Sequence, residues 1–140
     1  MKVILAFLFA FLIHTCSTAQ DTWKVVHNGK QLLKTANEDE AKNIIVILKS
    51  DLKKDGYLMV NYSEAKKQNG WKRAIIIFDE KDSELVKQSG SSFKITNQKL
   101  NALANGRQML KIYTIALPAD PKLAAAIRIR RIHLCTITFT

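Results

Sequence analysis

The run from Ala124 to Thr140, AAAIRIRRIHLCTITFT, is the sequence feature that most restricts what this chain can fold into. It is the longest strand-like stretch, rich in β-branched residues, and it comes last. An isolated strand is not stable, so this one must complete a sheet formed by earlier residues. Its alternation of apolar and basic residues changes phase between Arg130 and Arg131, which predicts a β-bulge at that point.

Short apolar runs separated by turn signals fill the rest of the chain. Asn28-Gly29 between two apolar segments is the pattern of a tight type I′ hairpin over Trp23–Thr35. A short helix is predicted over Gln98–Ala104, with Thr96 or Asn97 as its cap. A second short turn is predicted through Ala125, with Asp120 as its cap and Pro121 at the first helical position. This pattern predicts a mainly β protein, an antiparallel β-sandwich of about seven short strands with one or two short helices. The other expected strands are Asn43–Lys49, Tyr57–Tyr62, Trp71–Phe78, Glu84–Gln88, Phe93–Ile95 and Gln108–Leu117.

One segment, Ala41–Lys54, supports two interpretations. Asn37 and Glu40 have the spacing of a capping box, and the apolar residues that follow share a helical face. Against a helix, Ile44–Ile47 is a continuous β-branched run, which favours a buried strand. We favour the strand because its neighbours are β; if the segment is helical, the fold class becomes α+β.

The N-terminus predicts export. Lys2, the apolar run Val3–Ile13 and the small residues ending at Ala19 are the three parts of a secretory signal peptide. We therefore expect a signal peptide over residues 1–19, a single mainly β domain over residues 20–140, and a periplasmic or extracellular location. Cys16 offers an alternative, since a cysteine after an apolar run can carry a lipid anchor. The apolar run is too short for a transmembrane helix.

The charge balance is strongly basic. The chain has 22 Lys and Arg against 12 Asp and Glu; loss of Lys2 with the signal peptide leaves 21 against 12, a net charge of +9. An acidic protein, a glycan or another envelope component would suit this charge. The lysines are also scattered among acids, as on an ordinary solvated surface. Nucleic acid is disfavoured by the export signal, although aromatic and basic residues lie together in one stretch: Tyr57, Tyr62 and Trp71 with Lys66, Lys67, Lys72 and Arg73.

Four arginines form the main candidate site. Arg128, Arg130 and Arg131 lie beside the predicted bulge, and a bulge that directs adjacent arginines outward would form an anion-binding patch, to which Arg73 is added. The alternative is that these arginines form salt bridges with acids of a neighbouring strand.

His133 and Cys135 form a second candidate site. In a regular strand, residues two apart share a face, and an imidazole with a thiol suits copper or zinc. The plainer interpretation is a buried small thiol and a polar residue near a sheet edge. No cofactor is implied by any motif.

Catalytic motifs are missing from the sequence: there is no Gly-rich phosphate loop, no serine nucleophile elbow and no helical pair of histidines with an intervening acid. The sequence therefore favours a non-enzymatic binding or interaction module with a basic surface for an acidic partner or ligand. A metal-binding or redox domain that uses His133 and Cys135 is the alternative.

Overall fold

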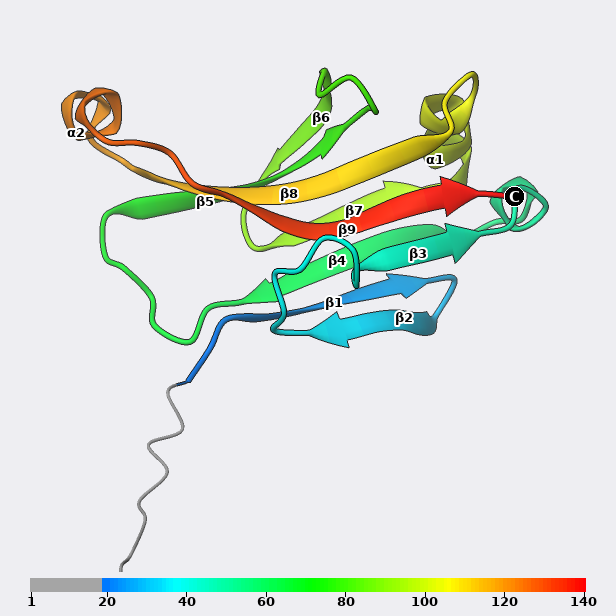
Figure 1. Cartoon of the computed structure of the whole chain (residues 1–140), viewed down its shortest axis with the longest axis horizontal. Coiled ribbons are helices and arrows are strands. Elements are labelled where there is room, and N and C mark those ends of the chain that lie inside the picture. The colour runs from blue at the N-terminus through cyan, green and yellow to red at the C-terminus, as the bar shows by residue number, and fades with distance from the viewer. Residues whose placement is uncertain (1–18) are drawn as a thin grey trace, which may run out of the picture.

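Nine short strands form two facing sheets in the computed structural model, which describes residues 19–140 (Figure 1). The predicted mainly β sandwich is confirmed. Cys16 and all but the last residue of the predicted signal peptide lie outside the described residues. The strands are β1 (Thr22–His27), β2 (Lys30–Thr35), β3 (Ile44–Ile47), β4 (Tyr57–Ser63), β5 (Trp71–Phe78), β6 (Glu84–Ser89), β7 (Ser92–Thr96), β8 (Met109–Pro118) and β9 (Arg131–Phe139), with helices α1 (Asn97–Ala104) and α2 (Pro121–Ala126).

The two sheets enclose one main core. The first sheet has the strand order β2-β1-β4-β7 and the second has the order β3-β9-β8-β5-β6. Alternate residues of the strands point inward, so each sheet contributes an apolar face to the space between them. Trp23, Phe93 and Leu134 are among the largest fully buried side chains there. Neither helix in the described part of the chain is long and apolar enough to cross a membrane.

The opening hairpin forms as predicted. β1 and β2 pair antiparallel around Asn28 and Gly29. Both residues have positive φ, 50° for Asn28 and 80° for Gly29, as a type I′ turn requires. The predicted helix caps are also confirmed. At α1, the Thr96 hydroxyl accepts a hydrogen bond from the Lys99 backbone N–H. At α2, the Asp120 side chain accepts one from the Lys122 backbone N–H, and Pro121 occupies the first helical position.

The ambiguous segment contains a strand. Ile44–Ile47 forms β3, and a short 3₁₀ turn, η1 (Asp51–Lys53), follows it. The sheet is not wholly antiparallel, however, because β3 pairs parallel with β9, Ile44 lying beside Thr136. A long connection between β3 and β9 allows them to pair in the same direction. Local sequence patterns do not show whether two distant strands pair parallel or antiparallel.

The closing strand begins later than its sequence predicts. Residues 121–126 form α2, and β9 begins only at Arg131. The bulge is also displaced: β8 pairs Ile112 with Cys135 and Tyr113 with His133, so the extra residue is Leu134. The predicted bulge at Arg130-Arg131 is therefore wrong. The alternation of apolar and basic residues changes there because pairing with β8 begins at Arg131, and Arg128 and Arg130 precede the paired strand.

A buried asparagine at the start of α1 joins two other segments at one end of the sandwich. The two N–H donors of the Asn97 amide are shared among three acceptors, the Asn28 side chain and the backbone carbonyls of Asp51 and Lys54, at 2.9, 3.1 and 2.9 Å. Its oxygen lies 3.0 Å from Nε2 of His27. We call this group the Asn97 junction. It fixes the β1–β2 turn, η1 and the start of α1 relative to one another.

Candidate functional site

The segment between β8 and β9 is the most exposed continuous stretch that carries the predicted site residues. Residues 119–130, which we call the arm, are all exposed except for the half-buried Ala124. Figure 1 places α2, and with it the arm, at one end of the molecule, opposite α1 and the β1–β2 turn. The Ala119 N–H donates to the Gly70 carbonyl at 2.7 Å, which holds the base of the arm against the start of β5.

The arm exposes large apolar side chains next to its cations. Leu123, Ile127 and Ile129 are 56%, 37% and 47% exposed, and Trp71, which pairs with Pro118 at the base of the arm, is 39% exposed. Ile127 and Ile129 alternate with Arg128 and Arg130 along an extended segment. The arm is therefore an exposed amphipathic surface, held to the rest of the described chain by the Ala119–Gly70 hydrogen bond and by the pairing of Arg130 with Glu38.

The four predicted arginines do not form one patch. Arg128 makes no salt bridge with any residue in 19–140, and Arg130 is paired with Glu38 but remains largely exposed. Arg131 lies on the outer face of the second sheet, 4.4 Å from the ring centroid of Tyr113 and 3.9 Å from the Asp82 carboxylate. Stacking on the ring holds Arg131 against the sheet.

Arg73 belongs to a separate network between the sheets. Its Nε–H donates to Glu64 at 2.5 Å, one of its Nη–H groups donates to Thr114 at 3.1 Å, and its guanidinium lies 4.3 Å from the ring centroid of Tyr62. The Tyr62 hydroxyl in turn donates to Asp21 at 2.6 Å. Arg73 does not join the other three arginines because it points inward from β5, with only 11% of its side chain exposed.

His133 and Cys135 are on opposite faces of the second sheet. The prediction that they share a face is wrong, because Leu134 is the inserted residue of the bulge and reverses the alternation. Cys135 points into the main core and is fully buried. His133 lies on the outer face beside Tyr113, with ring centroids 5.2 Å apart. The two side chains therefore do not form one set of metal ligands.

The His133 ring is buried and only partly hydrogen-bonded. Nε2 lies 2.9 Å from the Thr136 hydroxyl, while Nδ1 has no hydrogen-bond partner among residues 19–140. Burial lowers the pKa of His133, and Glu40 opposes this effect. Within residues 19–140, no group of three or more His, Cys, Asp or Glu side chains is arranged to hold a metal ion.

The Cys135 thiol gives a first testable prediction. Burial raises its pKa from 9.0 to about 12. The unfolded chain then releases the thiol proton at a lower pH than the folded chain, so the free energy of unfolding falls as pH rises above 9. From pH 9 to 10.5 this contribution amounts to about 1.5 kcal/mol. Urea unfolding is expected to show that Cys135→Ala lacks this part of the alkaline loss; equal losses in both proteins would mean that the folded thiol ionises normally.

A crevice that sequence reasoning missed opens between the edges of the two sheets. Its apolar lining comes from β6, β7 and α1, with Val86, Phe93, Ile95 and Leu103 as the main residues. The only sequence signal for it is the short Gly90-Ser91 connection, which carries the chain from one sheet to the other. That signal is weak, because most such connections join neighbouring strands of one sheet.

The chain has no match among protein-family models, curated proteins or solved structures.

Proposed function

We propose that this protein is an exported, non-enzymatic binding module that docks on anionic lipid surfaces through its arm. The observation that carries the proposal is the arm itself, which exposes Leu123, Ile127 and Ile129 together with Lys122 and Arg128 at one end of the molecule. Export rests on the predicted signal peptide over residues 1–19. The mass of the mature chain distinguishes cleavage after Ala19 from lipidation at Cys16.

The charges of the arm suit a negatively charged partner. Asp120 is the arm's only acid, and its carboxylate is occupied by the backbone N–H of Lys122 as the cap of α2. Each basic side chain near an anionic membrane surface contributes about 1 kcal/mol to binding. Arg130 contributes less, because part of its charge is offset by Glu38.

The apolar side chains of the arm favour a lipid surface over an acidic protein or a glycan. Isoleucine and leucine at the tip of a projecting segment can enter the boundary between headgroups and acyl chains while the flanking cations remain at the phosphates. A binding site for a soluble anion has no need of such exposed apolar groups.

Vesicle co-sedimentation tests the proposal. The protein is expected to bind phosphatidylcholine vesicles that contain phosphatidylglycerol, and to bind pure phosphatidylcholine vesicles at least tenfold more weakly. Arg128→Gln with Arg130→Gln is expected to reduce binding to the anionic vesicles about tenfold, at about 1 kcal/mol for Arg128 and less for Arg130. Ile127→Ser with Ile129→Ser is expected to reduce it by a similar factor, with the charge unchanged.

A matched control separates the arm from the overall charge. Lys30→Gln with Lys53→Gln removes two exposed cations at the opposite end of the molecule and is expected to change vesicle binding less than twofold. An equal loss in this variant would show that net charge alone drives binding. If the protein binds neither the anionic nor the pure phosphatidylcholine vesicles, the proposal is also overturned. An acidic protein would then be the partner of the arm.

A further inference from the structure

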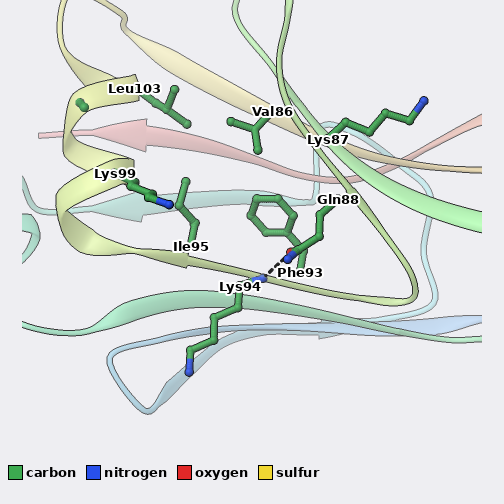
Figure 2. A pocket seen from close by; sticks show the side chains of 9 residues that line it. Val86, Lys87, Gln88, Phe93, Lys94, Ile95, Lys99 and Leu103 are labelled. Atoms are coloured by element: carbon green, nitrogen blue, oxygen red, sulfur yellow. Dashed lines mark hydrogen bonds between the residues drawn. The ribbon is translucent and has the colours of Figure 1, made fainter.

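The crevice lies where the sandwich is open. β6 is an edge strand of one sheet and β7 is an edge strand of the other, and the two strands follow each other in the chain. They are therefore joined at one end but do not pair, and α1 stands at the other end (Figure 2). The space between them is about 440 Å³. This volume falls within the range of roughly 300–1,000 Å³ that is typical of small-molecule sites.

The floor of the crevice is continuous with the main core. Phe93 and Ile95 are core residues with 1% and 6% exposure, and Val86 and Leu103 are half-buried and pack against that core. Figure 2 shows the Phe93 ring between β6 and β7, with Val86 and Leu103 on the side of α1. An apolar chain placed here would contact core side chains along its length, in place of water.

One polar bridge closes the crevice near the turn between the strands. The Gln88 side chain on β6 accepts a hydrogen bond from the backbone N–H of Lys94 on β7, at 3.0 Å. This bond links the two sheets across their open edge (Figure 2). The crevice therefore has a fixed floor and two fixed ends, which suits it to one narrow ligand.

The rim carries only positive charge. Lys87, Lys94 and Lys99 line the crevice, no acidic residue does, and none of these lysines forms a salt bridge with a residue in 19–140. The Lys94 ammonium group lies 4.0 Å from the Tyr57 ring centroid, away from the crevice. The Lys99 side chain extends from α1 toward Ile95 (Figure 2). Lys99 is therefore the cation best placed to meet an acidic headgroup.

We propose that the crevice binds a single-chain amphiphile with an anionic headgroup, such as a fatty acid. The acyl chain lies against Val86, Phe93 and Leu103, and the headgroup lies at the rim beside Lys99. The crevice shares no residue with the arm, so this inference does not depend on membrane docking.

Titration with dodecanoate below its micelle concentration, with no bilayer present, tests the proposal. The expected result is saturable binding with one dodecanoate per chain, with backbone NMR shifts concentrated at Val86, Ile95 and Leu103. Dodecylammonium, which has a tail of nearly the same length and the opposite charge, is expected to bind at least tenfold more weakly. Butyrate, which keeps the carboxylate and lacks the tail, is expected not to bind.

Two variants of exposed lysines make the test specific. Lys99→Gln is expected to weaken dodecanoate binding at least fivefold and to leave dodecanol binding unchanged, whereas Lys122→Gln on the arm is expected to change neither. Both residues are exposed, so both variants keep the fold. Equal affinity for dodecanoate and dodecylammonium, an equal loss in both lysine variants, or NMR shifts confined to the arm would each overturn the proposal. If the protein does not bind vesicles but does bind dodecanoate, only the proposed docking function is overturned.

Discussion

Replacing Asn97 with alanine is expected to lower the free energy of unfolding by about 3–4 kcal/mol. Asn97 is 1% exposed, and its side chain bonds to four residues from two other segments of the chain. Without its amide, the buried ring of His27 and the less buried carbonyls of Asp51 and Lys54 each lose a hydrogen bond, and a buried group left unsatisfied costs about 1–3 kcal/mol. Some of these groups can reach water at the end of the sandwich, so the losses do not add in full.

Urea unfolding measures the effect of Asn97→Ala, and Asn101→Ala is the matched control. Asn101 lies one turn further along α1 and is exposed, so its replacement is expected to change the free energy of unfolding by less than about 0.5 kcal/mol. A loss below about 1 kcal/mol for Asn97→Ala would contradict a structural role for the Asn97 junction. Asn97→Asp is expected to be at least as damaging, because a carboxylate oxygen would then face the three acceptors that the amide now serves.

The second large effect is expected at Trp23. Its indole N–H donates to the Leu134 carbonyl at 2.8 Å, so a side chain of the first sheet satisfies the bulge residue of the second. Trp23→Phe leaves that carbonyl buried without a donor and opens a cavity where the larger ring stood. The lost hydrogen bond and the cavity together are expected to lower the free energy of unfolding by about 2–4 kcal/mol.

An internal control exists for this change as well. Trp71→Phe removes the same atoms from a side chain that is 39% exposed, whereas Trp23 is 2% exposed. It is therefore expected to lower the free energy of unfolding by less than about 0.5 kcal/mol. Thermal unfolding of the two variants side by side is the measurement. Similar midpoints for the two would show that the link between Trp23 and the bulge contributes little to stability.

Features set by short stretches of sequence were predictable. The Asn28-Gly29 turn, the Thr96 and Asp120 caps and the strand at Ile44–Ile47 depend on the backbone preferences of a few adjacent residues, and all were confirmed. The sandwich followed from them, since short strands with apolar faces must pack against each other.

Features set by distant partners were not predictable. Alternation along β9 indicates a face only where the strand is paired, and the Leu134 bulge depends on the register with β8 and on a hydrogen bond from Trp23. For the same reason, the sequence placed His133 and Cys135 on one face and Arg73 beside the other arginines. The crevice depends on which strands become edges of the sheets, and no local pattern carries that information.

The position of β9 has a consequence for how the chain folds. β9 lies inside the second sheet, between β3 and β8, so until Arg131–Phe139 has been synthesised β3 has no strand with which to pair. Contacts that join residues so far apart in sequence slow folding, because a long loop must close before any of them stabilises the chain. The second sheet of a nascent chain therefore stays incomplete until β9 has been synthesised. For the proposed export this delay is an advantage, because a chain that has not yet closed its sheets can still be threaded through a narrow translocation channel.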